Sequence, residues 1–206
     1  MRTSFVITMA IAGVAGCDGQ PGRAPRPVAR PAVVDSVDLP VADNLDYVNW
    51  KSFQVGTSVT RKSVTRVGEN YTASVETFKL LAANDTEVVV ERQNTTERSD
   101  GSYKAINPPE KRKYVKSFRV PRGMKVEDLQ KPALAAKEVG KDLITVCGKT
   151  VKARIFKWSD RSDVGEMQVT LWLSDEIPGR IVKQEITVPA TKSQTLEEVT
   201  EMTVQR

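Results

Sequence analysis

Histidine is absent from the 206 residues of this chain, and only two cysteines occur. Without an imidazole, the chain cannot form a Ser-His-Asp triad, a Cys-His pair or a histidine-ligated zinc site, and it lacks the usual general base near neutral pH. Two cysteines are also too few for a disulfide framework or a multi-cysteine metal site. The composition therefore predicts a protein that is not an enzyme and that holds no metal and no cofactor.

An apolar run from Phe5 to Ala15 follows a short basic start that contains Arg2. Its eleven residues are too few for a membrane-spanning helix, because about 20 residues are needed to cross roughly 30 Å of hydrocarbon. A basic start, an apolar core and small residues at the end are typical of a secretory signal peptide. No apolar run of membrane-spanning length follows it.

The end of this run, Val14-Ala15-Gly16-Cys17, resembles the lipobox of bacterial lipoproteins. In that family the signal is cut before the cysteine, and the cysteine sulfur is lipidated. The resemblance implies a signal peptide over residues 1–16, lipidation of Cys17, and anchoring in a membrane of the bacterial cell envelope, with the domain facing the periplasm or the cell exterior. The alternative is an ordinary signal peptide with a chance cysteine. If Cys17 carries lipid, Cys147 has no disulfide partner within the chain.

Residues 17–44 hold the cysteine and a stretch with few aromatic or large apolar side chains, which cannot form a core. This composition predicts a semi-extended tether between the lipid and one β-rich envelope domain over residues 45–206. The tether is rich in proline and arginine: Pro21, Pro25, Pro27, Pro31 and Pro40, with Arg23, Arg26 and Arg30.

Short alternating runs separated by turn residues dominate the chain from Trp50 onward. The clearest contains Met167, Val169, Leu171 and Leu173, which should line one buried face of a strand. Consecutive runs of this kind predict a mostly β fold, with a single curved antiparallel sheet or open half-barrel.

Two details refine this prediction. The Ser-Val-Thr-Arg sequence of residues 58–61 recurs at residues 63–66, and this odd offset predicts a β-bulge near Arg61–Lys62. Met124–Glu138 is the one plausible helical region. Because Pro132 divides it, one or two short helices are expected there.

One segment carries a second resemblance. Trp172-Leu173-Ser174-Asp175-Glu176-Ile177-Pro178, followed by Arg180-Ile181-Val182-Lys183, resembles a strand-turn-strand passage of periplasmic lipoprotein-carrier (Lol-type) folds and their uncharacterised lipoprotein relatives. The resemblance implies an open half-barrel around one or two short helices that cover an apolar concavity. Such a concavity would suit an apolar or amphipathic ligand, although a fold by itself does not define a function.

Three tryptophans, Trp50, Trp158 and Trp172, are the candidate contacts for an apolar or amphipathic ligand, and core or rim positions are the alternative. The expected function is therefore that of a non-enzymatic envelope lipoprotein that binds such a ligand or an envelope protein.

The densest basic stretch suggests a rival function, a structural or interaction module. It would contact an anionic envelope polymer or a protein partner, whereas secretion argues against nucleic acid. The alternative is a sheet edge that lysines protect against further pairing. The cations concerned are Lys111, Arg112, Lys113 and Lys116.

Overall fold

The computed structural model describes residues 39–98 and 101–205. The expected signal peptide, Cys17 and most of the expected tether lie outside the described residues. No helix within the described ranges has the length and apolarity that crossing a membrane requires.

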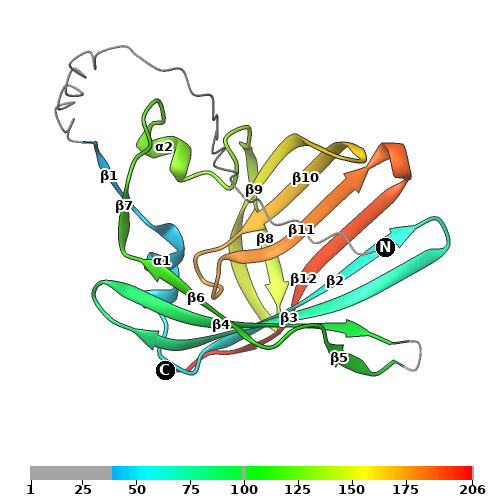
Figure 1. Ribbon diagram of the computed structural model, residues 1–206, viewed down its shortest axis with the longest axis horizontal. Coiled ribbons are helices and arrows are strands. Elements are labelled where there is room, and N and C mark those ends of the chain that lie inside the picture. Colours follow the sequence, from blue (N-terminus) through cyan, green and yellow to red (C-terminus); the bar gives the residue numbers. More distant parts are fainter. Residues whose placement is uncertain (1–38, 99–100, 206) are drawn as a thin grey trace, which may run out of the picture. The chain divides into compact units, whose positions relative to one another are not determined.

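Within those residues, ten strands form one antiparallel sheet, in the order β5-β4-β3-β2-β12-β11-β10-β9-β8, with β6 also paired to β4 (Figure 1). The two ends of this order do not pair, so the sheet is not closed into a barrel. The predicted fold class, a mostly β protein with an open antiparallel sheet, is confirmed. The strands are β2 (Ser58–Val67), β3 (Asn70–Ala83), β4 (Glu87–Glu97), β5 (Tyr103–Ala105), β6 (Glu110–Val115), β8 (Lys137–Val146), β9 (Lys149–Ser162), β10 (Gly165–Leu173), β11 (Ile181–Val188) and β12 (Ser193–Thr203).

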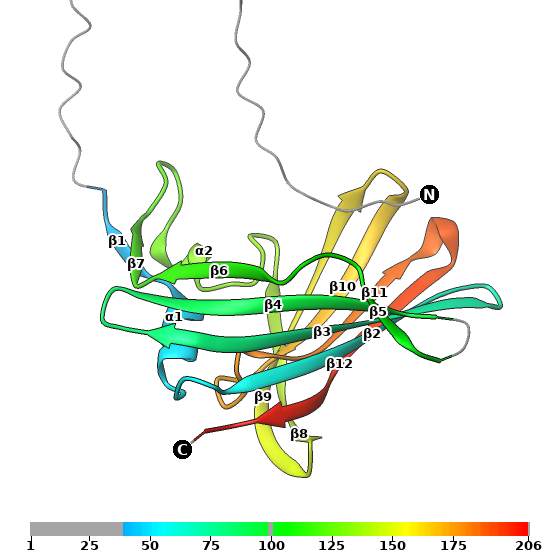
Figure 2. The same ribbon diagram turned by 60° about the horizontal axis from the view of Figure 1, so that its bottom comes forward.

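The sheet curves around the helix α1 (Leu45–Lys51), as Figures 1 and 2 show. Tyr47 and Trp50 lie three residues apart and so share one face of the helix. They join one buried apolar cluster with side chains of β2, β3 and β4 and, from the other end of the sheet, Val146 and Val151. Residues from both ends of an open sheet can share a core only if the sheet is strongly bent.

A helix at Leu45–Lys51 was not predicted. It begins after Asn44, whose side-chain oxygen accepts hydrogen bonds from the backbone N–H groups of Asp46 and Tyr47. This is an ordinary N-cap. Seven residues are too short for a visible helical period.

The predicted helical region around Pro132 contains the helix α2 (Val126–Leu129), and no second helix follows it. Residues 130–136 form turns, and we call them the strap. Two smaller elements complete the fold: β1 (Val41–Asp43) pairs with β7 (Ser117–Arg119), and η1 (Pro189–Thr191) is a single 3₁₀ turn.

The prediction of a β-bulge near Arg61–Lys62 placed the bulge in the wrong strand. β2 pairs with β3 without any shift, whereas β12 carries an extra residue between Val199 and Glu201, opposite Arg61 and Thr60. The partner strand β12 therefore contains the irregularity, and Arg61 takes an inward, buried position.

The predicted buried face of β10 is confirmed at Val169, Leu171 and Leu173.

Candidate functional site

A groove of about 510 Å³ lies between α1, β7 and the strap on one side and the strands β9–β11 on the other. We call it the inner groove. Its volume is within the range of small-molecule sites, roughly 300–1,000 Å³. Its apolar lining consists of Leu45, Phe118, Leu129, Pro132, Trp158, Leu171, Leu173 and Ile181, and its polar lining of Asn44, Asp46, Lys131, Arg180 and Gln184.

The floor of the groove follows from the strand register. Leu171 lies opposite Phe156, and Val169 lies opposite Trp158, so these side chains share one face of β9 and β10. A second buried cluster forms on this face, and it includes Ala136, the last residue of the strap. The strap covers only part of the cluster, and the rest of the face forms the floor of the groove.

Asn49 of α1 holds the loop that connects β10 with β11. Its Nδ2 donates to the carbonyl oxygens of Asp175 at 3.0 Å and Ile177 at 3.1 Å, and its Oδ1 accepts from the N–H of Gly179 at 2.7 Å. Asn49 is buried, and Ile177 is fully buried beside it. One side chain thus satisfies three backbone groups of a loop distant in sequence, and we call this arrangement the Asn49 clasp.

The clasp positions Arg180 at the groove. Arg180 has a φ of 65°, in the left-handed region that residues other than glycine seldom adopt. Its Nε donates to Asp175 Oδ1 at 3.0 Å, and its side chain is only 10% exposed although it lines the groove. A backbone held in this conformation is a common feature of binding sites.

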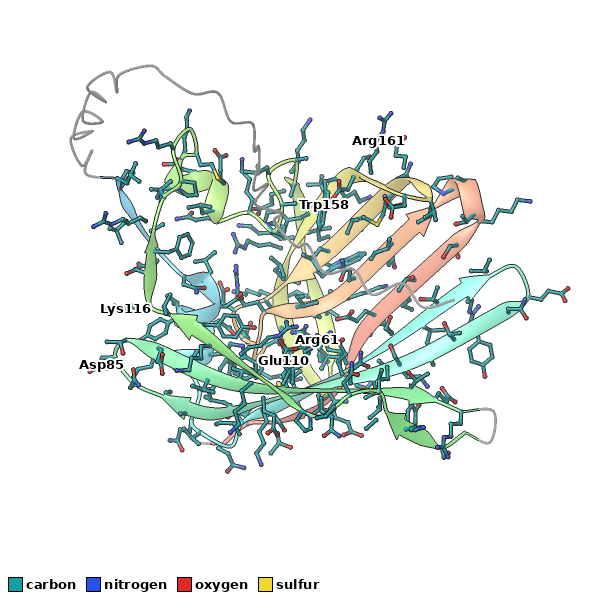
Figure 3. All side chains as sticks on the ribbon, viewed as in Figure 1. Arg61, Asp85, Glu110, Lys116, Trp158 and Arg161 are labelled. Carbon is teal, nitrogen blue, oxygen red and sulfur yellow. The ribbon has the colours of Figure 1, made fainter. Side chains whose placement is uncertain are left out.

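Charged side chains continue the inner face of the sheet beyond the groove. Arg61 lies with its Nη1 3.7 Å from Glu197 Oε1, its Nη2 donates to Gly179 O at 3.1 Å, and its guanidinium stacks over Phe78 at 4.8 Å. In Figure 3, Arg61 lies near the middle of the sheet and Trp158 lies above it, toward the β9–β10 turn.

Burial determines how several of these groups titrate. It raises the pKa of Glu197, against the opposing charge of Arg61, and it raises the pKa of Asp46, against Arg180 and Arg61. It lowers the pKa of Arg61, against Glu197. All three groups therefore titrate away from their ordinary values chiefly because their burial disfavours the charged form.

The structure separates the three candidate tryptophans. Trp158 lines the inner groove. Trp50 is 2% exposed and belongs to the core around α1. Trp172 lies on the opposite face of β10 from Leu171, where the Nζ of Lys183 lies 5.0 Å from its ring centroid. Of the three candidate tryptophans, Trp158 is therefore the one that can contact a ligand in this groove.

The four candidate cations lie on or next to β6, beyond β4. Arg112 pairs with Glu110 at 3.3 Å, and Lys113 pairs with Glu87 at 3.4 Å. Lys111 and Lys116 are exposed. A contact with an anionic polymer stays a prediction, and two of its four cations already have carboxylate partners.

Sequence reasoning missed Asn49, Gly179 and Arg180. No local pattern marks Asn49, and the Lol-type resemblance included Arg180 only as part of a strand. Within the described residues, no cluster of three acidic or cysteine side chains is arranged to hold a metal ion. The site is thus an amphipathic groove in an open, curved antiparallel sheet, and its geometry suits binding.

No family model matches this chain, and no curated protein matches it. Solved structures similar to it include an exported protein with a YmcC-like fold from Bacteroides fragilis, with 11% identity and a TM-score of 0.49, covering 73% of this chain and 97% of that one. The lipoprotein LppX of Mycobacterium tuberculosis is 9% identical with a TM-score of 0.36, covering 77% and 93%. An outer membrane lipoprotein-sorting domain from Vibrio parahaemolyticus is 10% identical with a TM-score of 0.29, covering 78% and 92%. At these values the similarities carry no functional assignment.

Proposed function

We propose that this protein is a non-enzymatic envelope lipoprotein, anchored through Cys17, which binds an amphipathic ligand in the inner groove. The observation that carries the proposal is the lining of the groove. Apolar side chains of β9–β11 form its floor, and the charged residues Asp46, Lys131 and Arg180 also line it. An apolar chain would lie along the floor, and a polar head would meet these charged groups.

Tryptophan fluorescence tests the ligand. The full-length protein, freed of co-purified lipid, is titrated with a lauroyl lysophospholipid below its critical micelle concentration. The emission should shift in the wild type and in Trp172→Phe, and it should fail to shift in Trp158→Phe, because Trp158 alone of these two lines the groove.

An unchanged emission on folded, lipid-free wild type would contradict the proposal, and so would an equal response of the two variants. Native mass spectrometry of the protein purified from its own envelope gives an independent test. An amphiphile of defined mass should co-purify with the wild type.

The anchor has its own test. Fractionation of cells should find the wild type in membranes and Cys17→Ser in the soluble fraction, because the tether has no apolar segment that could replace the acyl chains. Wild type that already partitions as a soluble protein would remove the lipobox interpretation and leave the groove untouched.

A further inference from the structure

The strand β8 forms one edge of the ten-stranded sheet, and it is exposed along most of its length. Val146 is its one buried residue. Two large apolar side chains stay in solvent, since Val139 is 54% and Leu143 65% exposed. Figure 2 shows the β8–β9 hairpin projecting below the rest of the sheet. An exposed edge of ten residues can pair with a strand of another chain.

The turn at Cys147 and Gly148 determines which backbone groups of β8 point outward. Both turn residues have positive φ, 49° and 77°, as in a type I′ hairpin. The residues flanking such a turn, Val146 and Lys149, exchange hydrogen bonds, and bonded pairs then alternate with non-bonded pairs along the ladder. The residues whose N–H and C=O point away from β9 are Lys141, Leu143 and Thr145.

Leu143 agrees with this assignment. Its N–H donates to Oδ1 of Asp142 at 2.7 Å and takes no carbonyl oxygen of β9. In the part of the chain that the structure describes, this is the one hydrogen bond on the outward backbone of β8. The edge is therefore open except where the carboxylate of Asp142 occupies it.

The side chains beside this edge are basic. Lys141 lies opposite Arg154, and Leu143 lies opposite Lys152, so three cations surround one exposed leucine. They line a hollow of about 610 Å³, which Asp142 and Asp175 also border. Over the described ranges, neither Lys141 nor Lys152 has an ion pair, and Arg154 has only Glu138 at 3.9 Å.

This arrangement differs from the edge at β6, where Arg112 and Lys113 are paired with carboxylates. A second copy of β8 would bring its own Lys141 to an edge where Lys141 and, on the neighbouring β9, Lys152 already lack a carboxylate partner among the described residues, so like charges would lie close together. The same cations favour a strand that carries carboxylates. We propose that β8 is a docking edge for an extended acidic segment of another protein, which adds to the sheet as a further strand with its acidic side chains on Lys141 and Lys152.

Fluorescence anisotropy tests this with the full-length protein and a fluorescein-labelled ten-residue peptide of alternating glutamate and valine. Binding should be saturable. A peptide N-methylated at every second residue keeps the charges and loses the donors of one edge, and it should bind at least about tenfold more weakly. The double variant Lys141→Glu/Lys152→Glu should weaken binding by about the same factor.

A matched charge reversal on the other edge, Lys111→Glu/Lys113→Glu, should leave the affinity within about twofold. Asp142→Ala frees the Leu143 N–H and removes a carboxylate, so it should tighten binding about threefold. Equal affinity for the methylated peptide would overturn the proposal, because charge alone would then explain binding. An equal loss in the two double variants would overturn it as well.

Analytical ultracentrifugation tests the remaining alternative, that a second copy of this chain covers β8. Leu143→Pro removes an outward donor without breaking a bond to β9. A wild-type dimer that this variant dissociates would show that a second copy covers β8, and it would overturn the proposal. A monomeric wild type that binds the peptide, and a proline variant that binds it more weakly, would support it.

Discussion

The apolar cluster around α1 and the cluster beside the strap lie on the same sheet, but the first is larger and its central side chains are more deeply buried. Around α1, Trp50 is 2% exposed and Ile177 is fully buried. Beside the strap, Leu171 and Leu173 are buried, whereas Trp158 and Ile181 are only partly covered. The inner groove lies over this second cluster.

The difference follows from what covers each cluster. A helix satisfies its own backbone hydrogen bonds, so α1 can press Tyr47 and Trp50 against the sheet without burying unpaired polar groups. The strap consists of turns, whose backbone needs solvent or side-chain partners, and such segments remain at the surface. A regular cover therefore seals a core, and an irregular one leaves room for a ligand.

Replacing one tryptophan in each cluster by alanine should give the largest difference in the free energy of unfolding. Trp50→Ala should lower the free energy of unfolding by about 3–5 kcal/mol, the usual range for a buried aromatic residue. Trp158→Ala should cost about 1–2 kcal/mol, because its ring is already partly in solvent, and it should abolish ligand binding in the groove. Urea unfolding measures both, and equal losses would contradict the contrast between the clusters.

Gly179→Ala should cost about 3 kcal/mol. The new Cβ would lie 2.8 Å from Nη2 of the buried Arg61 and 3.4 Å from Trp50, at a φ of 71°. Backbone strain accounts for about 1–2 kcal/mol, and the clash for the rest. Gly148→Ala is the control: its φ is 77°, but nothing lies within 4 Å, so strain alone should remain. Similar losses of stability in Gly179→Ala and Gly148→Ala would show that the Arg61 side chain moves aside for the new Cβ.

Asn49→Ala removes the clasp and should cost about 1–3 kcal/mol, because the carbonyls of Asp175 and Ile177 and the N–H of Gly179 lose a buried partner. It should also weaken ligand binding, since Arg180 is then held less firmly. Lys51→Ala on the same helix breaks only the exposed ion pair with Asp85 and should cost less than about 1 kcal/mol. A clasp variant as stable as this control would show that the loop keeps its own conformation.

The smallest effect is in the pH dependence of stability. Burial raises the pKa of Glu197 above its ordinary value of 4.5, so the folded protein binds more protons than the unfolded chain between these two values. Stability should therefore fall as pH rises from 4.5 through the folded pKa, and Asp46 contributes in the same direction from its own ordinary value of 3.8.

Urea unfolding at a series of pH values measures this slope. Glu197→Gln should flatten it, whereas the same change at the half-exposed Glu198 should not. A steeper slope in Glu197→Gln would show that the carboxylate favours folding in its charged form.

Strand alternation in the sequence predicted the open antiparallel sheet and the buried face of β10, because a period of two needs no knowledge of distant partners. It predicted neither α1, which is too short to show a period, nor the strand that carries the bulge, because register depends on both partners. Trp158 was identified together with Trp50 and Trp172, and alternation alone could not separate a groove position from a core position.

The sequence by itself determined the mostly β fold and the exclusion of histidine-dependent chemistry, since these depend on local composition and spacing. The lipid anchor at Cys17 stays a prediction of the sequence. Only the tertiary structure decided where the groove lies, which tryptophan lines it, and that Asn49, Gly179 and Arg61 meet. Asn49 and Gly179 are 130 residues apart, and a hydrogen bond over that separation follows from how the sheet bends. Bending is a property of the whole sheet, and no single segment of the chain encodes it.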